Sequence, residues 1–269
     1  MSEKIYDRSF DLDPATQEAY ADFVAIIRQL RRDCPWDREQ THESVKHLLI
    51  EEAYETVEAI DVEDWDELKK ELGDLLLHVV FHSVMAQERG SFTLKEVIDA
   101  ETDKLVRRHP HVFGEMDVEG VGEVLANWEQ IKMKEGGKKS ALDGVPRSLP
   151  ALLRAQRVQE KAAGVGFDFP AAEGAWEKVE EELREFRATL REGSEKEREA
   201  EFGDLLFAMV NYARFVDVTP ENALSRTNDK FSHRFQYIEA SLRAKGIAMN
   251  EATLEEMDAL WDEAKAQGM

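Results

Sequence analysis

Apolar residues recur at helical spacing along most of this 269-residue chain, and the alternating pattern of a strand is scarce. The chain is therefore predicted to be all-α. Helices are expected over residues 14–31, 41–60, 63–88, 93–108, 149–162, 171–192, 195–216, 220–244 and 252–266.

Helix starts are marked by two kinds of local signal. An N-cap residue followed by a first-turn proline occurs at Asp13-Pro14 and at Thr219-Pro220. The spacing of a capping box occurs at Thr93 with Glu96 and at Ser194 with Glu197.

The two halves of the chain carry the same blocks of sequence. The block Glu-Glu-x-x-Glu at 51–55 recurs at 181–185, and Glu-x-Gly-Asp-Leu-Leu at 71–76 recurs at 201–206, a shift of 130 in both cases. Later blocks recur at slightly different shifts, as expected when loops differ in length and helices match. The pattern indicates an internal duplication.

The duplication predicts two tandem helical domains with a linker between them. The stretch from 134 to 150 is rich in glycine, proline and lysine and has no sustained apolar period. We place an N-terminal domain at 1–136, a linker at 137–150 and a C-terminal domain at 151–269.

Four acidic side chains are expected to converge in the C-terminal copy. Residues three apart on a helix face the same way, so Glu182 pairs with Glu185, and Glu201 pairs with Asp204 on the next helix. A short connection makes an antiparallel hairpin of the two helices. Gly203 is expected to allow a close approach of their backbones.

A fold would hold four uncompensated carboxylates together only for a cation, because like charges repel. Oxygen ligands favour magnesium, manganese or calcium over zinc or copper. Mg²⁺, with Mn²⁺ as a possible substitute, is expected because it also accepts substrate phosphates. Single acidic pairs in a chain with 57 acids are usually just solvated. Here the paired motif occurs twice and borders the core, which favours a metal site. The N-terminal equivalents are Glu52, Glu55, Glu71 and Asp74.

Basic residues complete a candidate phosphate site. Lys178 lies one turn before Glu182, and Lys230 and Arg234 lie one turn apart. Each is by itself typical of a surface ion pair, and only the spacing relative to the acids favours a catalytic role. Glu181 flanks the cluster and is placed to orient a water.

Composition narrows the class of protein. The formal net charge is −22, which disfavours binding to nucleic acid but allows small polyphosphates bridged by a metal. The single cysteine, Cys34, suits a reducing compartment. No membrane span or signal-peptide core is visible, so a cytoplasmic protein is expected.

These motifs resemble those of the MazG family of nucleoside triphosphate pyrophosphohydrolases. The resemblance extends over nearly the whole chain and includes the strings ArgArgHisProHisValPhe at 107–113 and ValGlyPheAspPhe at 165–169. It implies four-helix-type domains of the all-α nucleoside triphosphate pyrophosphohydrolase superfamily that assemble into homodimers. It also implies attack of water at the α-phosphorus of ribo- and deoxyribonucleoside triphosphates, with broad base use.

The resemblance also assigns roles to residues. It implies that Glu182, Glu185, Glu201 and Asp204 bind magnesium, that Lys178, Lys230 and Arg234 neutralise phosphates, and that Trp261 belongs to the nucleotide pocket. By its spacing alone, Trp261 is more simply a buried residue that anchors a helix.

The N-terminal copy departs from the pattern. Leu48 stands where the C-terminal copy has Lys178, and Lys46 lies on roughly the opposite helix face. We expect the N-terminal copy to bind metal but to hydrolyse poorly, which makes the C-terminal copy the main catalytic one.

Two alternatives remain open. One is a relative with a narrower substrate, such as a dUTPase-like enzyme or a phosphoribosyl-ATP pyrophosphohydrolase. The other is a non-catalytic helical scaffold, whose acids bind metal structurally and whose partner is a regulatory protein.

Overall fold

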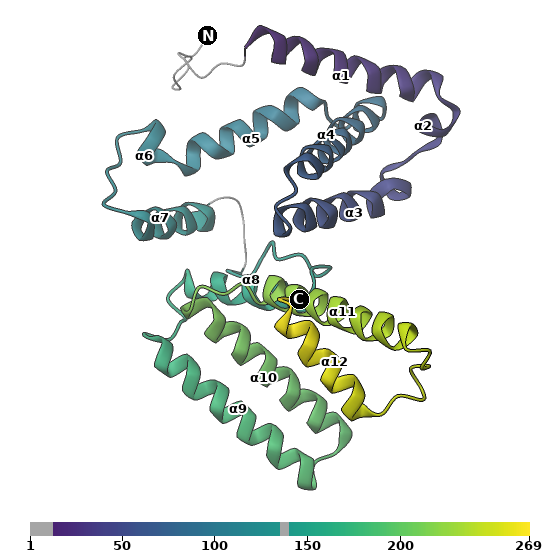
Figure 1. The fold of residues 1–269 in the computed structure, drawn as a ribbon. Coiled ribbons are helices and arrows are strands. Elements are labelled where there is room, and N and C mark those ends of the chain that lie inside the picture. The colour runs from purple at the N-terminus through teal and green to yellow at the C-terminus, as the bar shows by residue number, and fades with distance from the viewer. Residues whose placement is uncertain (1–12, 135–139) are drawn as a thin grey trace. The chain divides into compact units, whose positions relative to one another are not determined.

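The structure, a computed structural model, describes residues 13–134 and 140–269. Within these ranges the chain forms twelve α-helices and no strand, which confirms the predicted all-α fold (Figure 1). The chain divides into two compact units, Met1–Val124 and Leu125–Met269. Their division lies inside a helix, α7 (Val121–Lys134), and the boundaries expected from the sequence stay a prediction.

Unit 1 is built around the hairpin of α3 and α4. Its helices are α1 (Pro14–Asp33), α2 (Pro35–Glu39), α3 (His42–Asp61), α4 (Trp65–Glu88), α5 (Leu94–Arg108) and α6 (Pro110–Phe113), followed by the start of α7. The core joins α1, α3 and α4 through the buried side chains of Ile27, Val45, Val80, Phe81, Val84 and Met85. Burial of this apolar surface fixes how α3 and α4 face each other.

Unit 2 consists of two helix hairpins that both contact α8. Its helices are α8 (Ala151–Ala163), α9 (Ala172–Glu192), α10 (Glu195–Phe215), α11 (Pro220–Ala244) and α12 (Leu254–Ala266). Figure 1 shows α9 beside α10 and α11 beside α12. Each hairpin has its own small core: Val179, Leu205 and Ala208 in the first, and Ile238, Leu242 and Leu260 in the second.

Local capping explains where these helices begin. Both predicted capping boxes are present, with the Glu96 carboxylate accepting from Thr93 N at 2.7 Å and the Glu197 carboxylate accepting from Ser194 N at 2.7 Å. Asp13 caps α1 as expected. Thr219 precedes Pro220 at the start of α11, but its side chain makes no capping hydrogen bond.

Three helices were not expected from the sequence. Two of them, α2 and α6, have only five and four residues, which is too short to show a period. The third, α7, begins at Val121, and the glycines on either side of it are more typical of a loop than of a helix start. None of the helices in the described part of the chain has both the length and the apolar character needed to cross a bilayer.

Candidate active site

The α9/α10 hairpin brings the C-terminal acidic motifs together. The connection is limited to Gly193 and Ser194, and the Ser194 cap starts α10 directly. Packing of Val179 against Leu205 and Ala208 sets the two helices side by side. The predicted antiparallel hairpin is therefore present, with its acidic residues on facing surfaces.

Glu182 is the centre of the C-terminal acidic cluster. One oxygen of Glu182 belongs with oxygens of Glu201 and Asp204 to a group whose members all lie within 4.8 Å of one another. Glu182 forms a second such group with Glu181 and Glu185. The Glu182 side chain is buried, with 6% of its surface exposed. The structure thus brings together the four carboxylates that the sequence predicted as metal ligands.

A lysine is held directly against this cluster. The Lys178 ammonium lies 2.5 Å from Glu182 Oε1 and donates a hydrogen bond to Glu181 Oε1 at 2.9 Å. These bonds raise the pKa of Lys178, Glu182 contributing first, so the ammonium stays charged. Lys178 therefore lies on the same face of α9 as Glu182, as the spacing predicted. Its hydrogen bond to Glu181 holds it there.

Mutual repulsion is visible in the pKa of Glu201. Burial raises it first, and the charges of Glu185, Asp204 and Glu182 raise it further, while Lys178 lowers it. The other three predicted ligands therefore all act electrostatically on Glu201. A cation bound between these carboxylates would offset their mutual repulsion and lower the pKa of Glu201.

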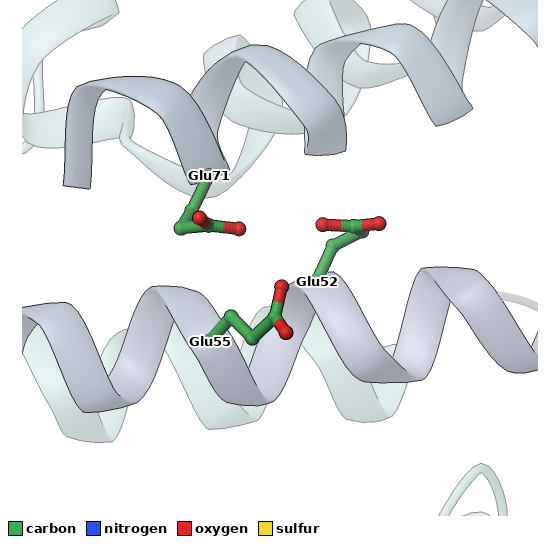
Figure 2. A group of neighbouring side chains, drawn as sticks. All are labelled: Glu52, Glu55 and Glu71. Carbon is green, nitrogen blue, oxygen red and sulfur yellow. The ribbon is translucent and has the colours of Figure 1, made fainter. Parts of the chain in front are cut away.

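The N-terminal copy repeats the arrangement with three acids. Figure 2 shows Glu52 and Glu55 on α3 and Glu71 on α4, with their carboxylates directed into the space between the helices. Their oxygens lie within 4.8 Å of one another. Among the described residues, Asp74 does not belong to this group of three acids. Burial is the main cause that raises the pKa of Glu52, and the charge of Asp74 is the next.

Glu71 is a buried acid of unit 1 whose surroundings favour a positive partner. Its side chain is 6% exposed, and its Oε2 atom has no hydrogen-bond partner. Burial, and then the charge of Glu55, raise the pKa of Glu71 to about 7. Buried carboxylate oxygens without donors are the chemistry that a hard divalent cation satisfies, so these residues fit such an ion.

The two copies differ at the position next to the acids. Leu48, the counterpart of Lys178, packs against the core of unit 1. Lys46 forms an ion pair with Glu43 instead of turning to the cluster. A small hollow beside the N-terminal acids has a volume of about 330 Å³, and its described lining contains five acidic residues, Ala59 and Val62 but no basic one.

The remaining predicted substrate contacts lie on α11 and α12. Arg234 on α11 lies over the Trp261 ring at 5.3 Å and donates from Nε to the carbonyl oxygen of Met269 at 2.8 Å. Trp261 is half-buried against the α11/α12 core, and Lys230 is exposed. Within one chain the structure does not bring these three residues into the cavity beside Lys178 and Glu182.

The role expected of Gly203 is wrong within a single chain. A Cβ atom built on Gly203 meets no heavy atom within 4 Å, so the contact between α9 and α10 does not require a glycine there. The hairpin instead closes on the apolar side chains of Val179, Leu205 and Ala208.

Sequence reasoning missed a cavity next to the C-terminal acids. It has a volume of about 760 Å³ and reaches from Lys178, Glu182 and Asp204 to residues of α8 and of the segment 165–169. Gln159 and Phe207 line it, and neither belongs to a repeated motif. The string at 165–169 is the part of this lining that the family resemblance includes.

The chain is similar in sequence to proteins of one known family. A family model described as the MazG nucleotide pyrophosphohydrolase domain matches residues 40–113. The nucleoside triphosphate pyrophosphohydrolase/pyrophosphatase MazG of Thermotoga maritima is 47% identical over 251 residues, covering 91% of this chain and 95% of that protein. The chain belongs to the MazG family.

Other relatives have a similar identity over a similar length of this chain. The nucleoside triphosphate pyrophosphohydrolase of Escherichia coli K12 is 46% identical over 252 residues, covering 91% of this chain and 96% of that protein. The uncharacterized protein YabN of Bacillus subtilis is 49% identical over 251 residues, and the match covers 51% of its length. The family resemblance predicted from the sequence is confirmed, and the MazG match at 40–113 includes the N-terminal acids.

The raised pKa of Glu71 predicts how pH and metal act on unit 1. An acid whose folded-state pKa is raised stabilises the fold at low pH, and this contribution is lost as pH rises from about 4.5 through about 7. In EDTA, calorimetry should show that Glu71→Gln removes part of the fall in melting temperature between pH 5.5 and pH 8. Mn²⁺ should raise the melting temperature of the wild type at pH 8 but act less on the variant.

Glu255→Gln, a change at an exposed residue of α12, is the control and should behave like the wild type. An identical pH and Mn²⁺ response in Glu71→Gln would contradict the assignment of Glu71.

Proposed function

We propose that the α9/α10 hairpin is the centre at which this chain cleaves nucleoside triphosphates at the α-phosphorus into monophosphate and pyrophosphate. As a member of the MazG family, the chain is a nucleoside triphosphate pyrophosphohydrolase. The observation that supports the location is the convergence of Glu182, Glu201 and Asp204 beside Lys178 at one end of a large cavity.

Mg²⁺ is the proposed cofactor, with Mn²⁺ as a substitute, and Glu182, Glu185, Glu201 and Asp204 are its proposed ligands. All four offer only carboxylate oxygens, which suits hard divalent cations better than zinc or copper. When bound, such an ion supplies charge neutralisation for the phosphates and activation of a water.

Lys178 is the proposed phosphate contact of this chain. Its ammonium lies beside Glu182, a proposed metal ligand. A phosphate bound to the same metal ion would therefore lie close to it. The hydrogen bond from Lys178 to Glu181 restricts its direction, so less ordering is needed on binding. A charged donor in this place stabilises negative charge that develops on the pyrophosphate leaving group.

Lys230, Arg234 and Trp261 are proposed as further substrate contacts from α11 and α12. The ring of Trp261 and the carbonyl of Met269 orient the Arg234 guanidinium. In a single chain they do not line the cavity, so this part of the proposal depends on a substrate or an assembly that brings the two groups together.

Homodimer formation is proposed from an apolar stripe that both copies expose. Phe202, Leu206 and Met209 on α10 are 47%, 40% and 52% exposed. Their counterparts on α4, at positions 72, 76 and 79, are also large, apolar and exposed. Repeated stripes of this kind are typical of surfaces that a second molecule covers.

A cytoplasmic location is also proposed, because the one cysteine, Cys34, is free and therefore suits a reducing compartment.

The α10 stripe gives a direct prediction about assembly. Leu206→Glu should convert a dimer to a monomer, because it places a charge in the apolar contact, and light scattering after gel filtration measures the mass. Leu254→Glu, at a 71% exposed site outside the stripe, should leave the mass unchanged. A wild-type monomer, or an unaffected Leu206→Glu dimer, would contradict the proposal.

Unequal roles are proposed for the two copies. Leu48 stands in place of the lysine, and the described lining of the hollow beside Glu71 contains no basic residue, which disfavours a phosphate there. We therefore assign hydrolysis to the C-terminal copy, and metal binding with a role in regulation or assembly to the N-terminal copy.

Product analysis tests both the activity and the asymmetry. Incubation with ATP and Mg²⁺ should yield AMP and pyrophosphate, and EDTA should abolish the reaction. Glu182→Gln should lower kcat by at least about 100-fold, since it removes a central ligand, whereas Glu52→Gln should change it by less than about threefold.

Other outcomes separate the alternatives. Equal losses in the two variants would refute the asymmetry, and ADP with phosphate would refute cleavage at the α-phosphorus. Turnover of only one of the common nucleoside triphosphates would indicate a narrow relative, such as a dUTPase-like enzyme. If none of the common nucleoside triphosphates yields pyrophosphate, the result would favour the alternative of a non-catalytic scaffold that binds a regulatory protein.

A further inference from the structure

The cavity in unit 2 has the size and position of a small-molecule site. Its volume of about 760 Å³ lies within the range of roughly 300–1,000 Å³ usual for ligand pockets. At one end are Lys178, Glu182 and Asp204, and the rest is formed by α8, α10, residues 141–142 and the segment 165–169. A triphosphate held at the acids would therefore have its nucleoside within reach of the cavity.

The lining away from the acids is largely apolar and contains aromatic rings. Phe167, Phe169 and Phe207 all border the cavity. Phe167 is 82% exposed, so its ring is available to a ligand instead of being used in the core. Flat aromatic surfaces stack on nucleobases with little preference for sequence, because every base has a π-face.

One polar group in the lining has an unused acceptor. Gln159 is 5% exposed, and its Nε2 atom donates to the carbonyl oxygen of Phe207 at 2.8 Å. A carbonyl can only accept, so this bond fixes the orientation of the amide. Its Oε1 atom then has no hydrogen-bond partner. A buried acceptor in this state favours a ligand that brings an N–H donor.

Charged residues hold the walls of the cavity without adding charge to its interior. Arg214 pairs with Asp168 at 2.7 Å and donates to Asn211 at 2.5 Å, which ties the segment 165–169 to α10. Lys161 donates to the carbonyl oxygen of Asp143 at 2.9 Å, which holds the neighbouring residues 141–142 against α8. Asn211 and Gln159 are the uncharged polar side chains of the described lining, and of the two Gln159 is the one with a buried acceptor that has no hydrogen-bond partner.

We propose that this cavity binds the nucleobase and that Gln159 Oε1 accepts a hydrogen bond from its Watson–Crick edge. This inference rests on the proposed function of the neighbouring acids. Adenine and cytosine offer an amino group on that edge, and guanine, uracil and thymine offer a ring N–H. A single acceptor therefore requires a donor without choosing between bases, which explains broad base use in physical terms.

The test compares substrates that differ only in this donor. Wild-type kcat/KM for UTP should exceed that for N3-methyl-UTP by at least about tenfold, and the same should hold for ATP against N6,N6-dimethyl-ATP. Gln159→Leu should lower kcat/KM for the unmodified nucleotides only, bringing both ratios close to one.

Failures of the two proposals are distinguishable. No pyrophosphate from either UTP or ATP with the wild type refutes the function itself. Release from UTP and N3-methyl-UTP at equal rates refutes only the cavity assignment. A ratio that stays near tenfold in Gln159→Leu indicates exclusion of the methyl group by shape and refutes the hydrogen bond. Loss of the ratio in Trp261→Ala, with no effect of Gln159→Leu, would place the base at Trp261.

A second variant covers the case in which Gln159→Leu does not fold. Phe167→Ala changes an exposed side chain and should raise KM for all nucleoside triphosphates several-fold with little change in kcat, through lost stacking. Phe92→Ala, at an exposed site in unit 1, is the matched control and should leave KM unchanged. An unchanged KM in Phe167→Ala would overturn the proposal.

Discussion

Repulsion between carboxylates on facing helices is the constraint on which this structure depends. Two like charges about 5 Å apart repel by roughly 3 kcal/mol at an effective dielectric of 20, and each hairpin holds at least three of them at or within that distance. The apolar contacts behind the acids keep the helices in place, as Val179, Leu205 and Ala208 do in unit 2. The fold thus maintains a site that a cation would relieve.

The same backbone arrangement carries different chemistry in its two copies. In the C-terminal copy Lys178 offsets part of the negative charge and stands beside a large cavity. In the N-terminal copy a leucine at that position joins the core, and Glu71 retains a proton to about pH 7 instead. The exchange of a lysine for a leucine at one helix position is thus the difference on which the proposed division of roles between the two copies rests.

The helices and the acidic clusters could be predicted from the sequence because their signals are periodic. Residues three apart must share a helix face, so the pairing of Glu182 with Glu185 and of Glu201 with Asp204 followed once the hairpin was assumed. The positions of Lys230, Arg234 and Trp261 relative to the acids depend on how α11 and α12 pack, and no local pattern encodes this. The free acceptor of Gln159 likewise arises from one tertiary contact with Phe207.

We propose that the carboxylates of α9 and α10 bind a divalent ion together with a nucleoside triphosphate. Anomalous diffraction from crystals soaked with Mn²⁺ and a triphosphate that resists cleavage between its α- and β-phosphorus atoms measures this directly. We expect an anomalous peak bounded by Glu182, Glu185, Glu201 and Asp204, with phosphate oxygens next to Lys178. A nucleotide and metal bound elsewhere, with these four side chains free of both, would contradict it.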